Sequence, residues 1–198
     1  MELICLGDSL TFGYGVRNSY RFTVLAAEAC GIKITNLGVC GDTTGGMLQR
    51  LHSQILTSPS YRDARPDKPR ILLMGGCNDI FYSGTDTGAR ANMGSMIHQL
   101  LSLGQPPLVG IPMHFCGSMP AEWESFSDRK SLAPVFDRYY SWLEAFCAAF
   151  HIPVLDFRPD FLLPDGRPDP SLFVDGIHPN AQGHARMARR LCAFLMQD

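Results

Sequence analysis

The sequence predicts an α/β fold with about five parallel strands in one sheet and helices on both faces. Short apolar runs alternate with segments of helical periodicity five times along the 198 residues, and this alternation is typical of a parallel sheet. A hydrophobic fraction of 45% and a charged fraction of 18% allow a sizeable core. Because no repeat, low-complexity segment or linker divides the chain, residues 1–198 are expected to form a single domain.

The elements are expected in strict alternation. The expected strands are Leu3–Leu6, Ile32–Leu37, Arg70–Met74, Leu108–Ile111 and Pro153–Phe157. The expected helices, each with apolar residues at helical spacing, are Tyr20–Cys30, Thr43–Leu56 (with Asp42 or Thr43 as N-cap), Ala89–Leu103, Leu132–Phe150 and Pro179–Leu195. Two long loops are expected at Ser58–Lys68 and Met113–Lys130. The second follows the fourth strand, so we expect it to line a pocket at the carboxyl edge of the sheet.

Composition and charge exclude several classes of protein. The net charge of −2, without a long basic run, gives no indication of a nucleic-acid partner. No apolar stretch reaches the ~18 residues of a membrane-spanning helix, and no leader pattern precedes the first strand. Seven scattered cysteines without a C-x-x-C pair favour a reducing compartment, and the expected location is the cytoplasm. We expect no metal, because the six histidines lack the H-E-x-x-H and H-x-H spacings. We also expect no cofactor, because the sequence has neither a P-loop nor a G-x-G-x-x-G motif after the first strand.

A serine follows the first strand directly, in Gly7-Asp8-Ser9-Leu10. Ligands of open α/β sheets bind beyond the carboxyl ends of the strands, so the Ser9 hydroxyl is a candidate nucleophile. An ordinary turn is the competing interpretation, because Gly, Asp and Ser are all common in turns.

Two further strand ends carry groups that could stabilise negative charge. Gly41 stands just before a helix N-terminus, where backbone N–H groups lack partners and the helix dipole favours an anion. Asn78 follows the third strand, in Gly-Gly-Cys-Asn-Asp, and its amide can donate to an oxyanion. Taken singly, each is equally well explained as a helix entry or a capping turn.

The last block, Asp175-Gly176-Ile177-His178-Pro179, offers an acid and a base three residues apart. Pro179 is expected at the first position of the final helix, which places His178 near its N-cap. Asp175 can accept the second ring N–H and fix the tautomer of the imidazole. A capping turn with a surface histidine is the alternative, and His184, inside the last helix, is expected at the surface or behind the site.

Together these blocks resemble the GDSL family, also called SGNH hydrolases. The resemblance rests on GDSL at 7–10, GVCGDTT at 38–44, GGCND at 75–79 and DGIHPNAQGH at 175–184. It implies a flavodoxin-like three-layer sandwich and a serine esterase with Ser9 as nucleophile, His178 as base and Asp175 as its orienting acid. It also implies an oxyanion hole formed by the Ser9 N–H, the Gly41 N–H and the Asn78 side chain.

The substrate stays open at this stage. The segment GDTTGGMLQRL is similar to the branch with arylesterase, thioesterase and lysophospholipase activity, which favours a small-molecule acyl ester. A carbohydrate O-acetylesterase of the same family is the alternative. His114, at the end of the fourth strand, and Asp8 are expected to contact substrate, although His114 is equally plausible as a turn residue. The acyl preference is expected to depend on the 79–88 and 113–130 loops.

Other classes of protein fit less well. There is no G-x-S-x-G elbow of the α/β-hydrolases and no S-x-x-K motif at Ser9. A non-catalytic flavodoxin-like binding module is the alternative from another class, but P-loop and G-x-G-x-x-G motifs are missing. The sequence gives no indication of the oligomeric state.

Overall fold

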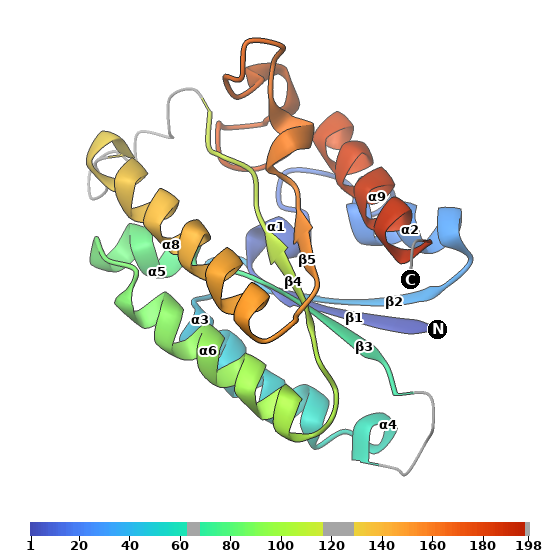
Figure 1. Ribbon diagram of the computed structural model, residues 1–198. Coiled ribbons are helices and arrows are strands. Elements are labelled where there is room, and N and C mark those ends of the chain that lie inside the picture. Colours follow the sequence, from blue (N-terminus) through green and yellow to red (C-terminus); the bar gives the residue numbers. More distant parts are fainter. Residues whose placement is uncertain (63–67, 117–128, 197–198) are drawn as a thin grey trace.

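Five parallel strands form one sheet in the computed structural model, which describes residues 1–62, 68–116 and 129–196 (Figure 1). Along the sheet the order is β2-β1-β3-β4-β5. The strands are β1 Glu2–Gly7, β2 Lys33–Gly38, β3 Arg70–Met74, β4 Leu108–Ile111 and β5 Val154–Asp156. Each lies within two residues of its expected bounds, because short apolar runs bounded by turn residues are strong local signals.

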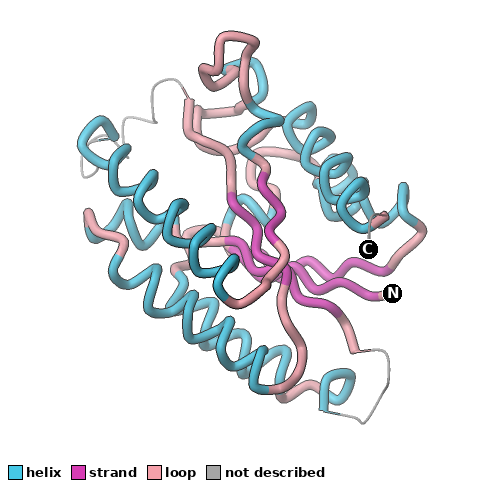
Figure 2. The backbone as a smooth tube through the Cα atoms, viewed as in Figure 1, coloured by secondary structure: helices cyan, strands magenta, loops and turns pink. Residues whose placement is uncertain are grey.

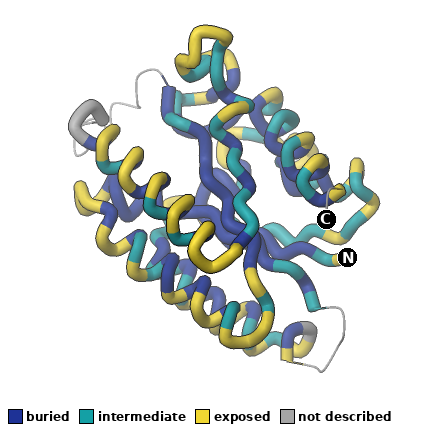
Figure 3. Tube along the Cα trace, viewed as in Figure 1, coloured by how far each residue is buried: buried dark blue, intermediate teal, exposed yellow. Residues whose placement is uncertain are grey.

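Helices cover both faces of this sheet, as the tube in Figure 2 shows. The α-helices are α1 Ser9–Phe12, α2 Phe22–Cys30, α3 Thr44–Arg50, α4 Pro59–Arg62, α5 Cys77–Ser83, α6 Thr87–Ser102, α8 Arg129–Ala149 and α9 Ala181–Leu195. One layer holds α2 packed on α9, and the other holds α3, α5, α6 and α8 (Figure 1). The expected α/β fold is confirmed. The central strands are buried, and the outward faces of the helices are exposed (Figure 3).

Short helices occupy places where the sequence predicts longer helices or loops. In place of the single helix expected over 43–56, α-helix α3 ends at Arg50 and a π-helical segment, η2 Leu51–Leu56, follows it directly. The expected helix over 20–30 is divided into the 3₁₀ turn η1 Asn18–Tyr20 and α2. Two more 3₁₀ turns are η3 Arg158–Phe161 and η4 Pro170–Leu172. The loops expected at 58–68 and 113–130 fall partly outside the described residues; within the described part, 59–62 form α4 and 129 begins α8.

Helix α5 was not expected, since 79–88 was predicted to be a loop. It begins directly after Gly76, whose φ of 109° turns the chain sharply away from β3. A side chain there would also meet the Tyr139 ring, because a Cβ on Gly76 would lie 2.5 Å from Tyr139 Oη. Only seven residues long, α5 is too short to show a helical period in sequence.

The strand order brings distant parts of the chain to one edge. Gly7 at the end of β1 pairs with Gly38 of β2 on one side and with Met74 of β3 on the other. The segments that follow these three strands carry Ser9, Gly41 and Asn78. Three groups that are far apart in sequence therefore lie at one corner of the sheet.

The cysteines do not all stay unpaired. A disulfide joins Cys30 at the end of α2 to Cys192 in α9, and it links the two helices of one layer. The reducing compartment expected from the scattered cysteines stays a prediction, and this pairing is an observation against it. Among the described residues, no helix has the length and apolarity needed to cross a membrane.

Candidate active site

Ser9 is the first residue of α1 and lies immediately beyond β1. Asp8 caps this short helix, because its Oδ1 accepts the N–H of Leu10 at 2.9 Å. A Cβ on Gly7 would lie 2.1 Å from Thr11 Oγ1, so the glycine is needed for close packing at this turn. The turn holds the Ser9 side chain at the edge of the sheet.

Ser9, His178 and Asp175 form a chain of hydrogen bonds. Ser9 Oγ lies 2.9 Å from His178 Nε2, and His178 Nδ1 lies 2.7 Å from Asp175 Oδ2. The other carboxylate oxygen accepts the backbone N–H groups of Ile177 at 3.0 Å and His178 at 2.8 Å. With the ring proton on Nδ1, the imidazole donates to Asp175 and accepts from Ser9. This arrangement can remove the hydroxyl proton and stabilise the resulting imidazolium.

Asp175 is held in its charged form. Partial burial raises its pKa, but hydrogen bonds from the His178 ring and from the backbone of His178 and Ile177 outweigh burial, so the pKa lies below its ordinary value. A carboxylate that stays ionised can fix the tautomer of the histidine throughout a reaction cycle.

The position of His178 relative to α9 differs from the prediction. Asn180, not His178, caps this helix, because its side chain accepts the N–H groups of Gln182 at 2.9 Å and Gly183 at 3.2 Å. Pro179 lies before the cap and pairs with Phe173 in an isolated bridge. An asparagine amide satisfies the first helical N–H groups better than a proline or an imidazole, so the helix begins two residues later and the His178 side chain stays available to Ser9.

An aromatic ring covers one face of His178. The Tyr14 ring centroid lies 4.5 Å from that of the imidazole, at an interplanar angle of 49°. Tyr14 is about half exposed, whereas His178 is buried. No local signal in the sequence connects Tyr14 with a residue 164 positions away.

Two of the three candidate oxyanion donors, Gly41 and Asn78, lie beside each other. Asn78 is buried, and its Nδ2 donates to the Asp42 carbonyl at 2.8 Å. A primary amide carries two N–H donors, so one N–H of Asn78 stays available for an oxyanion. Gly41 precedes Asp42 and has a φ of 75°, a conformation that favours glycine. A Cβ built on Gly41 would point toward Tyr82 and lie 3.6 Å from its hydroxyl.

Asp79 fixes α5 against α3. Its Oδ2 accepts the backbone N–H of Thr44 at 2.8 Å, and its Oδ1 accepts the Thr44 hydroxyl at 2.6 Å. Asn92 donates to the same hydroxyl oxygen at 3.2 Å. The residue after Asn78 therefore ties its helix to the start of the helix that follows Gly41. The block GGCND contains Asp79, but the sequence indicates no role for it.

Asp8 points into the protein, not toward solvent. It is 1% exposed. Burial raises its pKa to about 6, opposed by the Leu10 N–H and by His178, while Asp42 and Asp79 raise it further. This position favours a structural role in the turn over the substrate contact expected from sequence.

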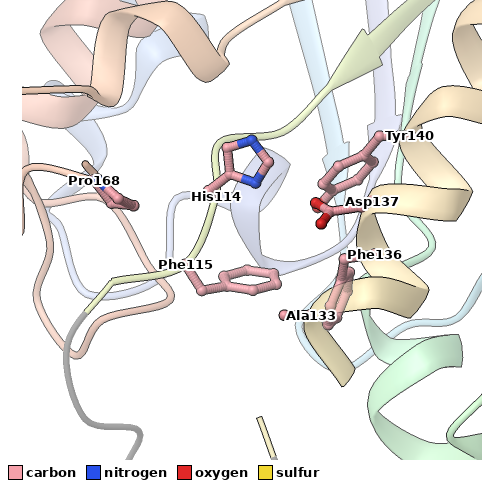
Figure 4. Close-up of a pocket in the computed structure, with 7 residues that line it drawn as sticks. All are labelled: His114, Phe115, Ala133, Phe136, Asp137, Tyr140 and Pro168. Carbon is pink, nitrogen blue, oxygen red and sulfur yellow. The ribbon is translucent and has the colours of Figure 1, made fainter. Parts of the chain in front are cut away.

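A cavity of about 240 Å³ opens beside the segment that follows β4. Figure 4 shows His114 and Phe115 of this segment facing the aromatic side chains of α8 across it. The lining residues are His114, Phe115, Ala133, Phe136, Asp137, Tyr140 and Pro168. The pKa of His114 is lowered by burial and by Arg158, against the opposing effect of Asp137 and Asp156. His114 therefore lies at a pocket wall, and its expected contact with substrate stays a prediction.

Two further side chains, Cys77 and His184, are buried. Cys77 packs in the core, with its Sγ 3.8 Å from Tyr140 Oη. His184 is fully buried, with its ring stacked on Phe22 and its Nδ1 accepting the Phe22 N–H at 3.3 Å. Of the two positions expected for it, the surface position is wrong, because α9 packs this face against α2, and the position behind the site stays a prediction. Within the described residues, no group of three His, Cys, Asp or Glu side chains is arranged to hold a metal ion.

Solved structures of similar fold cover almost the whole chain. A lipolytic protein of the G-D-S-L family from Veillonella parvula is 24% identical, with a TM-score of 0.79 and coverage of 100% of both chains. The aryl esterase of M. smegmatis is 20% identical, with a TM-score of 0.76 over 99% of this chain and 98% of that one. A carbohydrate acetylesterase family member from Sinorhizobium meliloti is 17% identical, with a TM-score of 0.73 over 99% and 97%. A comparison with curated proteins found no match.

The protein is a parallel three-layer sandwich with a serine, a histidine and an aspartate hydrogen-bonded to one another at its carboxyl edge, and its family identifies it as a hydrolase. The sequence profile of the GDSL-like lipase/acylhydrolase family matches residues 5–186. The chain belongs to this family, and the resemblance drawn from the four sequence blocks is confirmed.

Proposed function

We propose that this protein is a serine esterase that cleaves carboxylic esters through an acyl-enzyme on Ser9. The observation that carries the proposal is the hydrogen-bonded chain from Ser9 Oγ through His178 to Asp175, with distances of 2.9 and 2.7 Å. Nucleophile, base and orienting acid at these distances are the arrangement that activates a serine hydroxyl.

In the proposed reaction, Ser9 Oγ attacks the carbonyl carbon of the ester while His178 Nε2 takes the hydroxyl proton. The tetrahedral intermediate carries its negative charge on the former carbonyl oxygen. His178 then gives its proton to the alcohol oxygen as the C–O bond breaks, which leaves the acyl group on Ser9. Water, activated by the same imidazole, releases the carboxylic acid and restores the hydroxyl.

The oxyanion is proposed to receive hydrogen bonds from the Ser9 N–H, the Gly41 N–H and the second N–H of Asn78. Asn78 and Gly41 are both positioned through Asp42, one by its carbonyl and the other by the peptide bond. Loss of one donor of this kind lowers kcat by roughly 10²–10³-fold, so Asn78→Ala is expected to lower kcat within that range.

Ser9→Ala tests the proposal directly. It should lower turnover of p-nitrophenyl esters by at least about 10³-fold and abolish stoichiometric labelling by a fluorophosphonate probe, without changing the circular dichroism spectrum. Ser95→Ala, at an exposed position of α6, is the matched control and should leave both readouts unchanged. Turnover that survives in Ser9→Ala would contradict the assignment.

The cavity beside His114 supports an apolar acyl or aryl group in the substrate. Strand β4 is two strands from β1 in the sheet, which corresponds to about 10 Å at the usual strand spacing. The Cys116 N–H donates to the Gly176 carbonyl at 2.7 Å, so the segment that carries His114 touches the loop of Asp175 and His178. A chain attached to the reacting carbonyl could therefore enter the cavity.

The size of the cavity sets an upper limit on this group. A dry cavity of about 150 Å³ holds benzene, so 240 Å³ corresponds to about ten carbon atoms on the same scale. The aromatic walls favour such a group over the small acetyl of an acetylated sugar. A carbohydrate O-acetylesterase remains the second candidate, because the Sinorhizobium meliloti structure has the same fold.

A chain-length series of p-nitrophenyl esters, run beside acetylated sugars, separates the two candidates. We expect kcat/KM to rise from acetate to medium chains and to fall beyond about ten carbons. Ala133→Phe, which places a ring at the cavity, should shift the optimum to shorter chains. Ala145→Phe, at an exposed position of the same helix outside the lining, should not. An acetate optimum shared by all three proteins would favour the acetylesterase.

A further inference from the structure

Arg50, the last residue of α3, is a buried cation at the corner of the sheet that carries the candidate site. Its guanidinium makes four hydrogen bonds. Nε and Nη2 donate to Asp42 Oδ2 at 2.9 and 2.6 Å, Nη1 donates to the Leu37 carbonyl at 2.5 Å, and Nη2 donates to the Gly7 carbonyl at 2.8 Å. One side chain thus bridges the ends of β1 and β2 and the loop that follows β2.

Each acceptor of Arg50 is close in sequence to a proposed oxyanion donor. Gly7 lies two residues before Ser9, and Asp42 is bonded to Gly41. The Asp42 carbonyl also holds the Asn78 amide at 2.8 Å. The three groups proposed to donate to the oxyanion come from segments after three different strands. Arg50 contacts the first two of these segments directly and the third only through Asp42.

We propose that Arg50, acting through Asp42, is the positioning residue of the oxyanion hole; the inference rests on the esterase function proposed above. The guanidinium is a rigid planar fork that can satisfy several acceptors at fixed angles, which a single ammonium group cannot do. Its role is to hold the Gly41 N–H and the Asn78 amide in one arrangement before substrate arrives. Donors fixed in this way require no reorganisation as charge develops in the transition state.

The sequence around Arg50 leaves room for this contact. A Cβ on Gly46 would lie 1.8 Å from Asp42 Oδ1, so a side chain there would displace the carboxylate that Arg50 binds. Gly46 is not in the left-handed region, and its requirement for glycine therefore comes from the space taken by Asp42. This clash gives a second, uncharged way to disturb the same contact.

Arg50 could instead stabilise only the fold, since it also ties β1 to β2. A purely structural ion pair would affect the free energy of unfolding but not the rate of the chemical step in the folded enzyme. A positioning residue would lower kcat with little change in KM, because the oxyanion forms only in the transition state. Its effect would also overlap with that of Asn78, since both act on the same hydrogen bonds.

The test measures turnover of a medium-chain p-nitrophenyl ester by three single variants, Arg50→Lys, Gly46→Ala and Asn78→Ala. Two double variants, in which Asn78→Ala is combined with Arg50→Lys or with Gly46→Ala, are measured beside them. Arg50→Lys and Gly46→Ala should each lower kcat roughly 10- to 100-fold, with KM within about three-fold. Asn78→Ala should lower kcat by a distinctly smaller factor when it is added to Arg50→Lys or Gly46→Ala than when it is made in the wild type. Arg190→Lys, which alters the ion pair between α9 and Asp160 away from the site, should retain wild-type kcat.

The outcomes separate this inference from the proposed function. If the wild-type protein neither turns over esters nor reacts with a fluorophosphonate, the esterase proposal fails, and the role of Arg50 fails with it. If the wild type is active but Arg50→Lys keeps its kcat, or its effect simply multiplies with that of Asn78→Ala, only the positioning role is overturned. If Arg50→Lys does not fold, Gly46→Ala decides by the same criteria.

Discussion

Asp8→Asn should stabilise the protein at neutral pH and change its stability little near pH 4. Burial raises the pKa of Asp8 from its ordinary value of 3.8 to about 6 in the folded protein. Between these two values the folded protein binds a proton that the unfolded chain has released, so the free energy of unfolding falls as the pH rises through this range. Above about pH 6 the buried carboxylate is ionised, and its full cost is present.

The magnitude follows from the distance between the two pKa values. They differ by about 2 pH units, and one unit corresponds to about 1.4 kcal/mol, so the cost amounts to about 3 kcal/mol. Asparagine keeps the oxygen that accepts the Leu10 N–H and removes the charge. The difference in the free energy of unfolding between Asp8→Asn and the wild type should therefore rise by up to about 3 kcal/mol from pH 4 to pH 8.

Urea unfolding followed by circular dichroism at each pH measures this difference. Groups that titrate in both proteins cancel, so the rise isolates Asp8. Asp165→Asn, at an exposed carboxylate paired with Arg167, is the control and should show no such rise. If the difference in the free energy of unfolding between Asp8→Asn and the wild type is constant between pH 4 and 8, or decreases with pH, the raised pKa of the buried Asp8 is refuted.

Three further changes have defined outcomes. Tyr14→Leu should lower kcat about two- to five-fold, because the ring faces the imidazolium of the proposed base, whereas Tyr14→Phe should retain activity. Burial lowers the pKa of His184 to about 4, so the free energy of unfolding should fall as the pH drops below about 6.5, where the imidazole of the unfolded chain takes up a proton. In His184→Gln the midpoint of urea unfolding should no longer show this fall. Gly38→Ala, whose Cβ would lie 2.1 Å from the Phe12 nitrogen, should lower the free energy of unfolding by about 1–3 kcal/mol, while Gly45→Ala, with only ordinary contacts, should not.

Much of the fold could be predicted because its signals are local. An apolar run ended by a glycine marks a buried strand, and regular apolar spacing marks a long helix such as α8. Helix α5 was missed because seven residues are too few for a period. The start of α9 was misplaced because Pro179 and Asn180 both signal a helix start, and only the hydrogen bonds made by Asn180 decide between them.

By itself, the sequence determined the alternation of strands and helices, the family, and the identity of the residues proposed for chemistry, because these depend on residue type and spacing along the chain. Only the tertiary structure decided which distant groups meet. Ser9 and His178 are 169 residues apart. Arg50 donates hydrogen bonds to the ends of β1 and β2 and to the loop that follows β2. The cavity beside His114 and the burial of Asp8 and His184 likewise arise from packing between elements, which local patterns do not encode.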